Sequence, residues 1–165
     1  MKTTTRLMLL AVLALPVLAA CNKDEATPTA KVEKAAVPKP ANQTDEDAWN
    51  AYIQDQVVRN AQGASSTFAY TLPVPGAEGF DDSFQRQAEK AKEDVSRGGV
   101  EGTLMAFGSA DSAKTADLIA SAFQGVGVDT MKGVRVLFIG DAADRDRAEA
   151  AVKPSGAKFE FIEAK

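Results

Sequence analysis

In residues 44–165 of this chain, short apolar runs alternate with segments whose apolar residues recur at the spacing of a helix. Leu104–Phe107 and Val136–Ile139 are continuous apolar runs of strand length, and a glycine closes each of them. Strands that are apolar on both faces, with helices between them, are typical of parallel sheets, because such sheets are buried from both sides. We therefore predict an α/β fold, a small three-layer domain with a mostly parallel sheet of about four strands and flanking helices.

Turn and cap residues place the elements of this domain. The expected strands are residues 68–72, 104–107, 134–139 and 159–162. The expected helices begin at Thr44, which we take as an N-cap, near Asp82, after Ser109 or Asp111, and near Arg145. Apolar and polar residues alternate over 68–72, so we expect this strand at an edge of the sheet with one solvent-facing side.

The first 20 residues have a different composition. Lys2 and Arg6 are the only charged residues before Cys21. The uncharged stretch between Leu7 and Ala20 is shorter than the roughly 20 apolar residues that cross a bilayer. A charged start, a short apolar run and small residues at its end are typical of a secretory signal peptide, which we place at residues 1–20.

Leu18-Ala19-Ala20-Cys21 resembles the lipobox of bacterial lipoproteins, a family defined by its processing and not by its fold. The resemblance implies cleavage before Cys21, acylation of its sulfur and of the new amine, and attachment to the membrane through these acyl chains. It also explains why the chain has a single cysteine. Asn22 follows the cysteine, where an aspartate often favours retention at the inner membrane. The resemblance therefore implies the outer membrane, with the domain facing the periplasm; the inner membrane remains the alternative.

Residues 21–43 are expected to carry the lipid and to form a flexible linker, since residues 22–43 contain three prolines and no aromatic residue. Residues 44–165 form the periplasmic domain. The net charge of the chain is −4. The signal peptide and the linker are both positive, so the part from Thr44 onward carries −7. An acidic domain argues against binding to nucleic acid.

Absent residue types exclude several kinds of chemistry. The chain has no histidine and one cysteine. Ser-His-Asp and Cys-His catalysis, histidine-ligated metals and an internal disulfide are therefore excluded. We predict no catalytic residue, no metal and no cofactor.

Polar side chains follow two of the expected strands. Ser109, Asp111 and Ser112 come after residues 104–107, and Asp141 and Asp144 come after residues 134–139. Ligands of open α/β sheets bind at the carboxyl ends of strands, near helix starts, so these five residues are the candidate binding site. Aspartates and serines at these positions also cap helices, and we favour that interpretation. Asp141, Asp144 and Asp146 together could instead ligate a hard cation.

The function that we favour is a lipid-anchored, non-enzymatic module that binds another envelope protein or a secreted protein. Lipidated inhibitors and immunity proteins share this layout of signal peptide, cysteine, linker and small acidic domain. Two alternatives stay open: a carboxylate- or serine-based hydrolase of an envelope polymer, and a structural envelope lipoprotein. A deep pocket with converging polar groups would favour the enzyme, and a flat surface with an apolar centre would favour a protein partner.

The lipobox generates a direct prediction. Cells fed labelled palmitate should incorporate the label into the wild-type protein, and the Cys21→Ser variant should lose it, because the serine hydroxyl does not replace the thiolate as the nucleophile toward the lipid. The measurement is the label in the immunoprecipitated protein, with its total amount as control. Equal labelling of the two proteins would overturn the assignment of the anchor.

Overall fold

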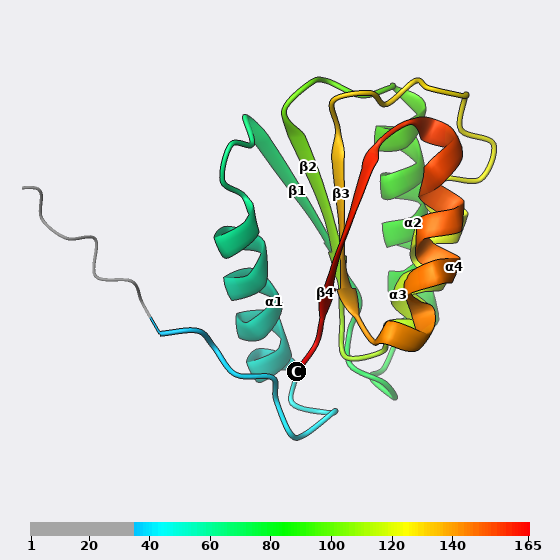
Figure 1. Cartoon of the computed structure of the whole chain (residues 1–165). Helices are drawn as coiled ribbons and strands as arrows, with labels where there is room; N and C mark the ends of the chain where they lie inside the picture. The colour runs from blue at the N-terminus through cyan, green and yellow to red at the C-terminus, as the bar shows by residue number, and fades with distance from the viewer. Residues whose placement is uncertain (1–34) are drawn as a thin grey trace, which may run out of the picture. The chain divides into compact units, whose positions relative to one another are not determined.

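Four parallel strands form a single sheet in the computed structural model of this protein, which describes residues 35–165 (Figure 1). The strands are β1 (Ser66–Thr71), β2 (Thr103–Gly108), β3 (Arg135–Gly140) and β4 (Lys158–Glu163). They lie side by side in the order β1-β2-β3-β4, and every neighbouring pair is parallel. The predicted α/β class and the edge position of the first strand are therefore confirmed. The lipobox, Cys21 and residues 22–34 lie outside the described residues.

Helices cover both faces of this sheet. They are α1 (Glu46–Asn60), α2 (Phe80–Ser96), α3 (Ser112–Ala122), α4 (Ala142–Val152) and the short 3₁₀ helix η1 (Lys153–Ser155). Consecutive strands are neighbours, and right-handed crossovers then bring every connecting helix to the same face, so α2, α3 and α4 lie together (Figure 1). Helix α1 precedes β1 and covers the opposite face (Figure 1). Among the described helices, none is both long enough and apolar enough to cross a bilayer.

The core has two parts because β2 and β3 are buried on both sides. Alternate residues of β2 and β3 face α1, where they meet Trp49, Tyr52 and Ile53. The residues between them face the other three helices, and there Phe107 stacks on Tyr70 with ring centroids 4.7 Å apart. The two wholly apolar runs seen in the sequence thus form the centre of the sheet.

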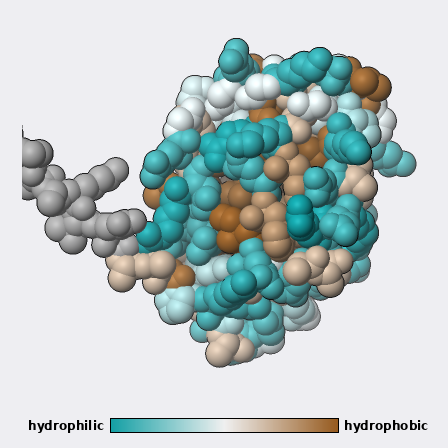
Figure 2. Space-filling model, viewed as in Figure 1, coloured by the Kyte–Doolittle hydropathy of each residue, from teal (hydrophilic) through white to brown (hydrophobic). Residues whose placement is uncertain are grey.

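The edge strand β4 is less deeply buried. Its apolar residues Phe159, Phe161 and Ile162 are only half-buried and pack against the margins of the two core parts. Figure 2 shows this side of the molecule, where an apolar patch is ringed by hydrophilic residues. Charged residues also occur on the strand itself, among them Lys158 and Glu160.

Residues 35–43, which we expected in the flexible linker, lie against the domain. The N–H of Val37 donates to Asp55 in α1 at 3.1 Å, and the Val37 side chain packs against the α1 part of the core. Lys39 donates to the carbonyl of Ala164 at 3.1 Å, and Trp49 donates to the carbonyl of Asn42 at 3.1 Å. These residues belong to the same compact unit, Ala35–Lys165, as the sheet.

The expected cap of the first helix is wrong by one residue. Asp45, and not Thr44, is the N-cap, because an Asp45 carboxylate oxygen accepts from the N–H of Ala48 at 3.0 Å. The Thr44 hydroxyl donates to the Asn42 side chain at 2.9 Å instead, so it is not available to α1.

One guanidinium joins three elements on the α1 face. Arg135 of β3 contacts both carboxylate oxygens of Glu160 in β4, the nearer at 2.7 Å. It also donates to the carbonyl of Asn60, at the end of α1, at 2.8 Å and to that of Gln62, just beyond the helix, at 3.0 Å. Hydrogen bonds from Arg135 lower the pKa of Glu160 below its ordinary value and outweigh burial, which raises it.

This pairing predicts a pH-dependent loss of stability in Glu160→Gln. The pKa of Glu160 is lower in the folded state, so its carboxylate stabilises the fold above the unfolded-state pKa, and this stabilisation disappears as the pH falls through the folded-state pKa. We expect the variant to be less stable at neutral pH by about 1.5–3 kcal/mol, the range for hydrogen bonds to charged groups. The two proteins should converge in acid.

Urea unfolding at a series of pH values measures this difference. Glu163→Gln is the matched control, because Glu163 is on the same strand but pairs with the exposed Lys165. A loss of stability for Glu160→Gln that is the same at every pH would contradict the assignment.

Candidate functional site

The five candidate residues lie at one end of the sheet, as the sequence predicts. Ser109, Asp111 and Ser112 follow β2 at the start of α3, and Asp141 and Asp144 follow β3 at the start of α4. The structure joins the two segments through Ser112. Its hydroxyl donates to Asp144 at 2.7 Å and accepts from the N–H of Asp141 at 2.8 Å. Sequence spacing predicted the shared edge, but not this contact between the segments.

Asp111 is the N-cap of α3. One of its carboxylate oxygens accepts from the N–H of Lys114 at 2.9 Å. The hydroxyls of Ser109 and Thr115 are 2.7 Å apart, and both approach the Asp111 carbonyl, at 3.0 and 2.9 Å. Ser109 is buried, so these bonds satisfy its hydroxyl inside the protein. The capping interpretation is confirmed for this segment.

Asp144 joins α4 to α3. One carboxylate oxygen accepts from Ser112, and the other accepts from Arg147 at 2.9 Å. Arg147 also donates to the Ala113 carbonyl at 3.0 Å and forms an ion pair with Asp117 in α3. The hydrogen bond to Asp144, followed by that to Asp117, raises the pKa of Arg147 against the effect of its burial. Asp144 therefore has a structural role, with both oxygens engaged within the protein.

Asp141 does not behave as its position suggests. It occupies the N-cap position of α4, but its side chain makes no capping hydrogen bond, so this part of the capping interpretation is wrong. Its carboxylate is 60% exposed and lies 3.7 Å from the ammonium of Lys39. Of the five candidates, Asp141 thus keeps the most accessible charged group, beside the segment that precedes α1.

The cation hypothesis for the three aspartates finds no support in the geometry. Nowhere in residues 35–165 do three histidine, cysteine, aspartate or glutamate side chains gather closely enough to hold a metal ion. Asp144 points to Ser112 and Arg147, and Asp141 points to Lys39, so these neighbouring carboxylates diverge.

The strand order differs from that of sheets that bind a ligand at this edge. Ligand crevices of doubly wound sheets form where the strand order reverses and neighbouring helices leave to opposite faces. The order β1-β2-β3-β4 contains no reversal, so α3 and α4 leave to the same face and pack on each other. Beyond the ends of β2 and β3, the hydrogen bonds of Asp144 with Ser112 and Arg147 join the two helices.

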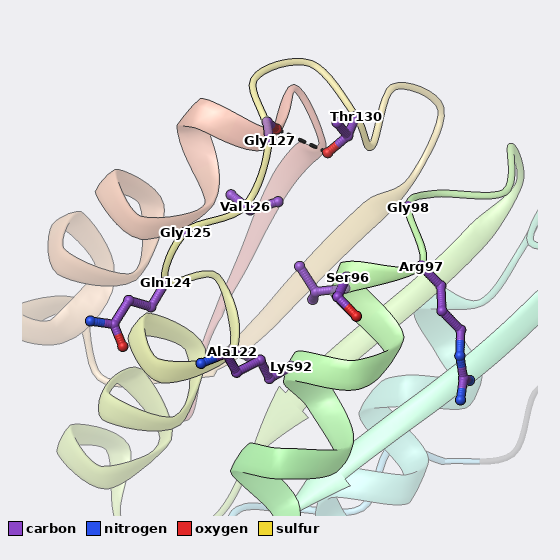
Figure 3. Close-up of a pocket in the computed structure, with 11 residues that line it drawn as sticks. Lys92, Ser96, Arg97, Gly98, Ala122, Gln124, Gly125, Val126, Gly127 and Thr130 are labelled. Atoms are coloured by element: carbon purple, nitrogen blue, oxygen red, sulfur yellow. Dashed lines mark hydrogen bonds between the residues drawn. The ribbon is translucent and has the colours of Figure 1, made fainter.

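Surface hollows lie elsewhere in residues 35–165, among them three that are lined by no candidate residue. The largest, about 390 Å³, is at the amino ends of the strands, between the end of α2 and residues 124–130 (Figure 3). Most of its lining residues are exposed, and Arg97 points away from it (Figure 3). A second hollow of about 220 Å³, between α1 and α2 at the end of β1, is lined by polar residues that include Glu46, Asn50 and Arg86. Sequence patterns do not predict these hollows, because each hollow combines segments that are distant in the chain.

The different contacts of the two cap positions predict different stabilities. Asp111→Ala removes the hydrogen bond to Lys114 N–H and should destabilise the domain by about 1 kcal/mol, the typical effect of losing an N-cap. Asp141→Ala removes no capping bond and should cost at most a few tenths of a kcal/mol. Thermal or urea unfolding of the two variants measures the difference. Equal losses would contradict the distinction between the two positions.

No family model, curated protein or solved structure matches this chain.

Proposed function

We propose that this protein is a lipoprotein of the outer membrane, anchored through lipid on Cys21, and that its α/β domain binds another envelope protein or a secreted protein without catalysis. The lipobox residues Leu18–Cys21 support the anchor. Residues 22–34 would let the domain begin at most about 45 Å from the lipid-bearing cysteine, the length of this segment when fully extended.

The observation that supports the binding role is that the hydroxyls of the candidate site are taken up by hydrogen bonds within the protein. The hydroxyl of Ser112 is held between Asp144 and the N–H of Asp141, at 2.7 and 2.8 Å. Ser109 is buried in hydrogen bonds to Thr115 and the Asp111 carbonyl. A hydrolase needs a serine or a carboxylate that faces a substrate cleft, and neither of these serines lines any of the three hollows. Other serines and acids do line them, but Ser83, Asp94 and Ser96 are held in hydrogen bonds within the domain, to Arg86, Tyr70 and the Glu93 carbonyl.

The surface favours a protein partner over a small ligand. Apolar side chains remain accessible at the two edges of the sheet, where Phe68 of β1 is 41% exposed and Phe161 of β4 is half-buried. Apolar groups set among charged ones are typical of the surfaces by which proteins associate. The net negative charge of the part from Thr44 onward favours a partner with a basic surface.

Crosslinking in intact cells tests this proposal with the full chain. We expect a discrete larger species that contains this protein and one other envelope or secreted protein. Phe107→Glu is the control, because a charge at this fully buried position should unfold the domain and abolish the species.

Two results would overturn the proposal. One is the absence of any crosslinked species with the wild-type protein. The other is release of soluble fragments from purified cell-wall polymer by the wild-type protein and not by Ser112→Ala, which would establish a serine-based hydrolase instead.

A further inference from the structure

The carboxyl end of β1 differs from the carboxyl ends of β2 and β3. Helix α1 packs on one face of the sheet and α2 on the other, and both helices begin at this end of β1 (Figure 1). Ligand crevices of α/β sheets form outside the carboxyl ends of strands, where the flanking helices lie on opposite faces. The polar hollow of about 220 Å³ lies at this place, between α1 and α2.

Side chains from three elements line this hollow, and most of them can form hydrogen bonds. The hydrogen-bonding members come from α1, the end of β1 and α2: Glu46, Asn50, Thr71, Ser83, Arg86 and Gln87. Leu72, which is buried, and Pro73, which is half-buried, add a small apolar part. The lining thus suits a polar ligand with a short apolar group.

Two opposite charges line the hollow without pairing with each other. Glu46 is in the first turn of α1, and among residues 35–165 it forms no ion pair and no side-chain hydrogen bond. Arg86 of α2 donates to the hydroxyl of Ser83 at 2.8 Å and pairs with no carboxylate of the described residues. Every other arginine of residues 35–165 pairs with a carboxylate. Arg86 therefore keeps donors for a carboxylate from outside the chain.

A small α-amino acid has the groups that match this lining. Its carboxylate can accept two parallel hydrogen bonds from a guanidinium, and its ammonium group can donate to a carboxylate. The amides of Asn50 and Gln87 can donate to or accept from either group. A water occupies about 30 Å³, so the hollow has room for roughly seven waters, which is close to the size of alanine or serine.

We propose that this hollow binds a small free α-amino acid, with the carboxylate at Arg86, the ammonium group at Glu46 and the short side chain against Leu72 and Pro73. The site goes beyond the proposed function: it adds a small ligand to a protein partner and does not depend on that partner. Glu46 and Arg86 are both exposed, and exposed ion pairs contribute little free energy. We therefore expect a dissociation constant on the order of 1 mM.

Nuclear magnetic resonance of the full chain in detergent micelles tests this proposal. The probe is alanine, and two matched probes each lack one charge: alanine methyl ester has no carboxylate, and N-acetylalanine has no ammonium group. We expect both to bind about fivefold more weakly than alanine, because each loses one ion pair. The amide signals that shift on addition of alanine should belong to residues 46–50, 71–73 and 83–87.

Variants of the protein assign each charge to its partner. Arg86→Gln should weaken alanine about fivefold and leave binding of the methyl ester unchanged, since the ester has no carboxylate to lose. Glu46→Gln should weaken alanine and leave binding of N-acetylalanine unchanged. Arg145→Gln and Glu149→Gln are the matched controls, because these residues form an exposed ion pair on α4. They should leave binding of all three probes unchanged, and circular dichroism checks that every variant is folded.

Four outcomes would overturn the amino-acid site: no saturable shift with alanine or serine up to about 20 mM, equal binding of alanine and its two derivatives, equal weakening by Arg145→Gln and Arg86→Gln, or shifts confined to residues away from the hollow. Each is separable from failure of the proposed function. The species crosslinked in cells should persist in Arg86→Gln and Glu46→Gln, since the protein partner does not require this hollow.

Discussion

Burial of β2 and β3 from both sides is the constraint on which the rest of the structure depends. Their apolar runs leave no face for water, so each side of the sheet needs a cover. The unbroken strand order sends all three crossover helices to one side. The opposite side must then be covered by chain that precedes β1, and α1 supplies that cover through Trp49, Tyr52 and Ile53. The segment before α1 completes it with Val37.

The same strand order determines what the carboxyl ends of the strands can do. Helices α3 and α4 leave the sheet toward the same side and pack against each other, so their polar first turns face each other across a short distance. Ser112, Asp144 and Arg147 connect the two helices there. Candidate site residues from the sequence, Ser112 and Asp144, thus hold the two helices together. The edges of the sheet remain as accessible surfaces.

Local patterns in the sequence were sufficient to predict the helices, the strands and the fold class, because apolar periodicity and helix caps depend on residues that are close together in the chain. The edge position of residues 68–72 followed from their alternation, and the Asp111 cap followed from its place before a helix. Contacts between distant segments could not be obtained in this way. The Arg135 contacts with Glu160 and with the carbonyls of Asn60 and Gln62, and the packing of Val37 on α1, depend on which segments the fold brings together. The Asp141 side chain was expected to cap α4, but it makes no capping hydrogen bond and lies near Lys39, which is also distant in the sequence.

The attachment of residues 35–43 also has a mechanical consequence. A pull on the chain from its N-terminal side reaches the domain first at the contacts of Val37 with Asp55 and of Lys39 with the Ala164 carbonyl. These are single hydrogen bonds that can open one after another, whereas the strands are held by whole ladders. Under load, this segment would detach before α1 is disturbed, lengthening the tether while the sheet stays intact. Residues 35–43 could therefore give way under load before the sheet and its helices do.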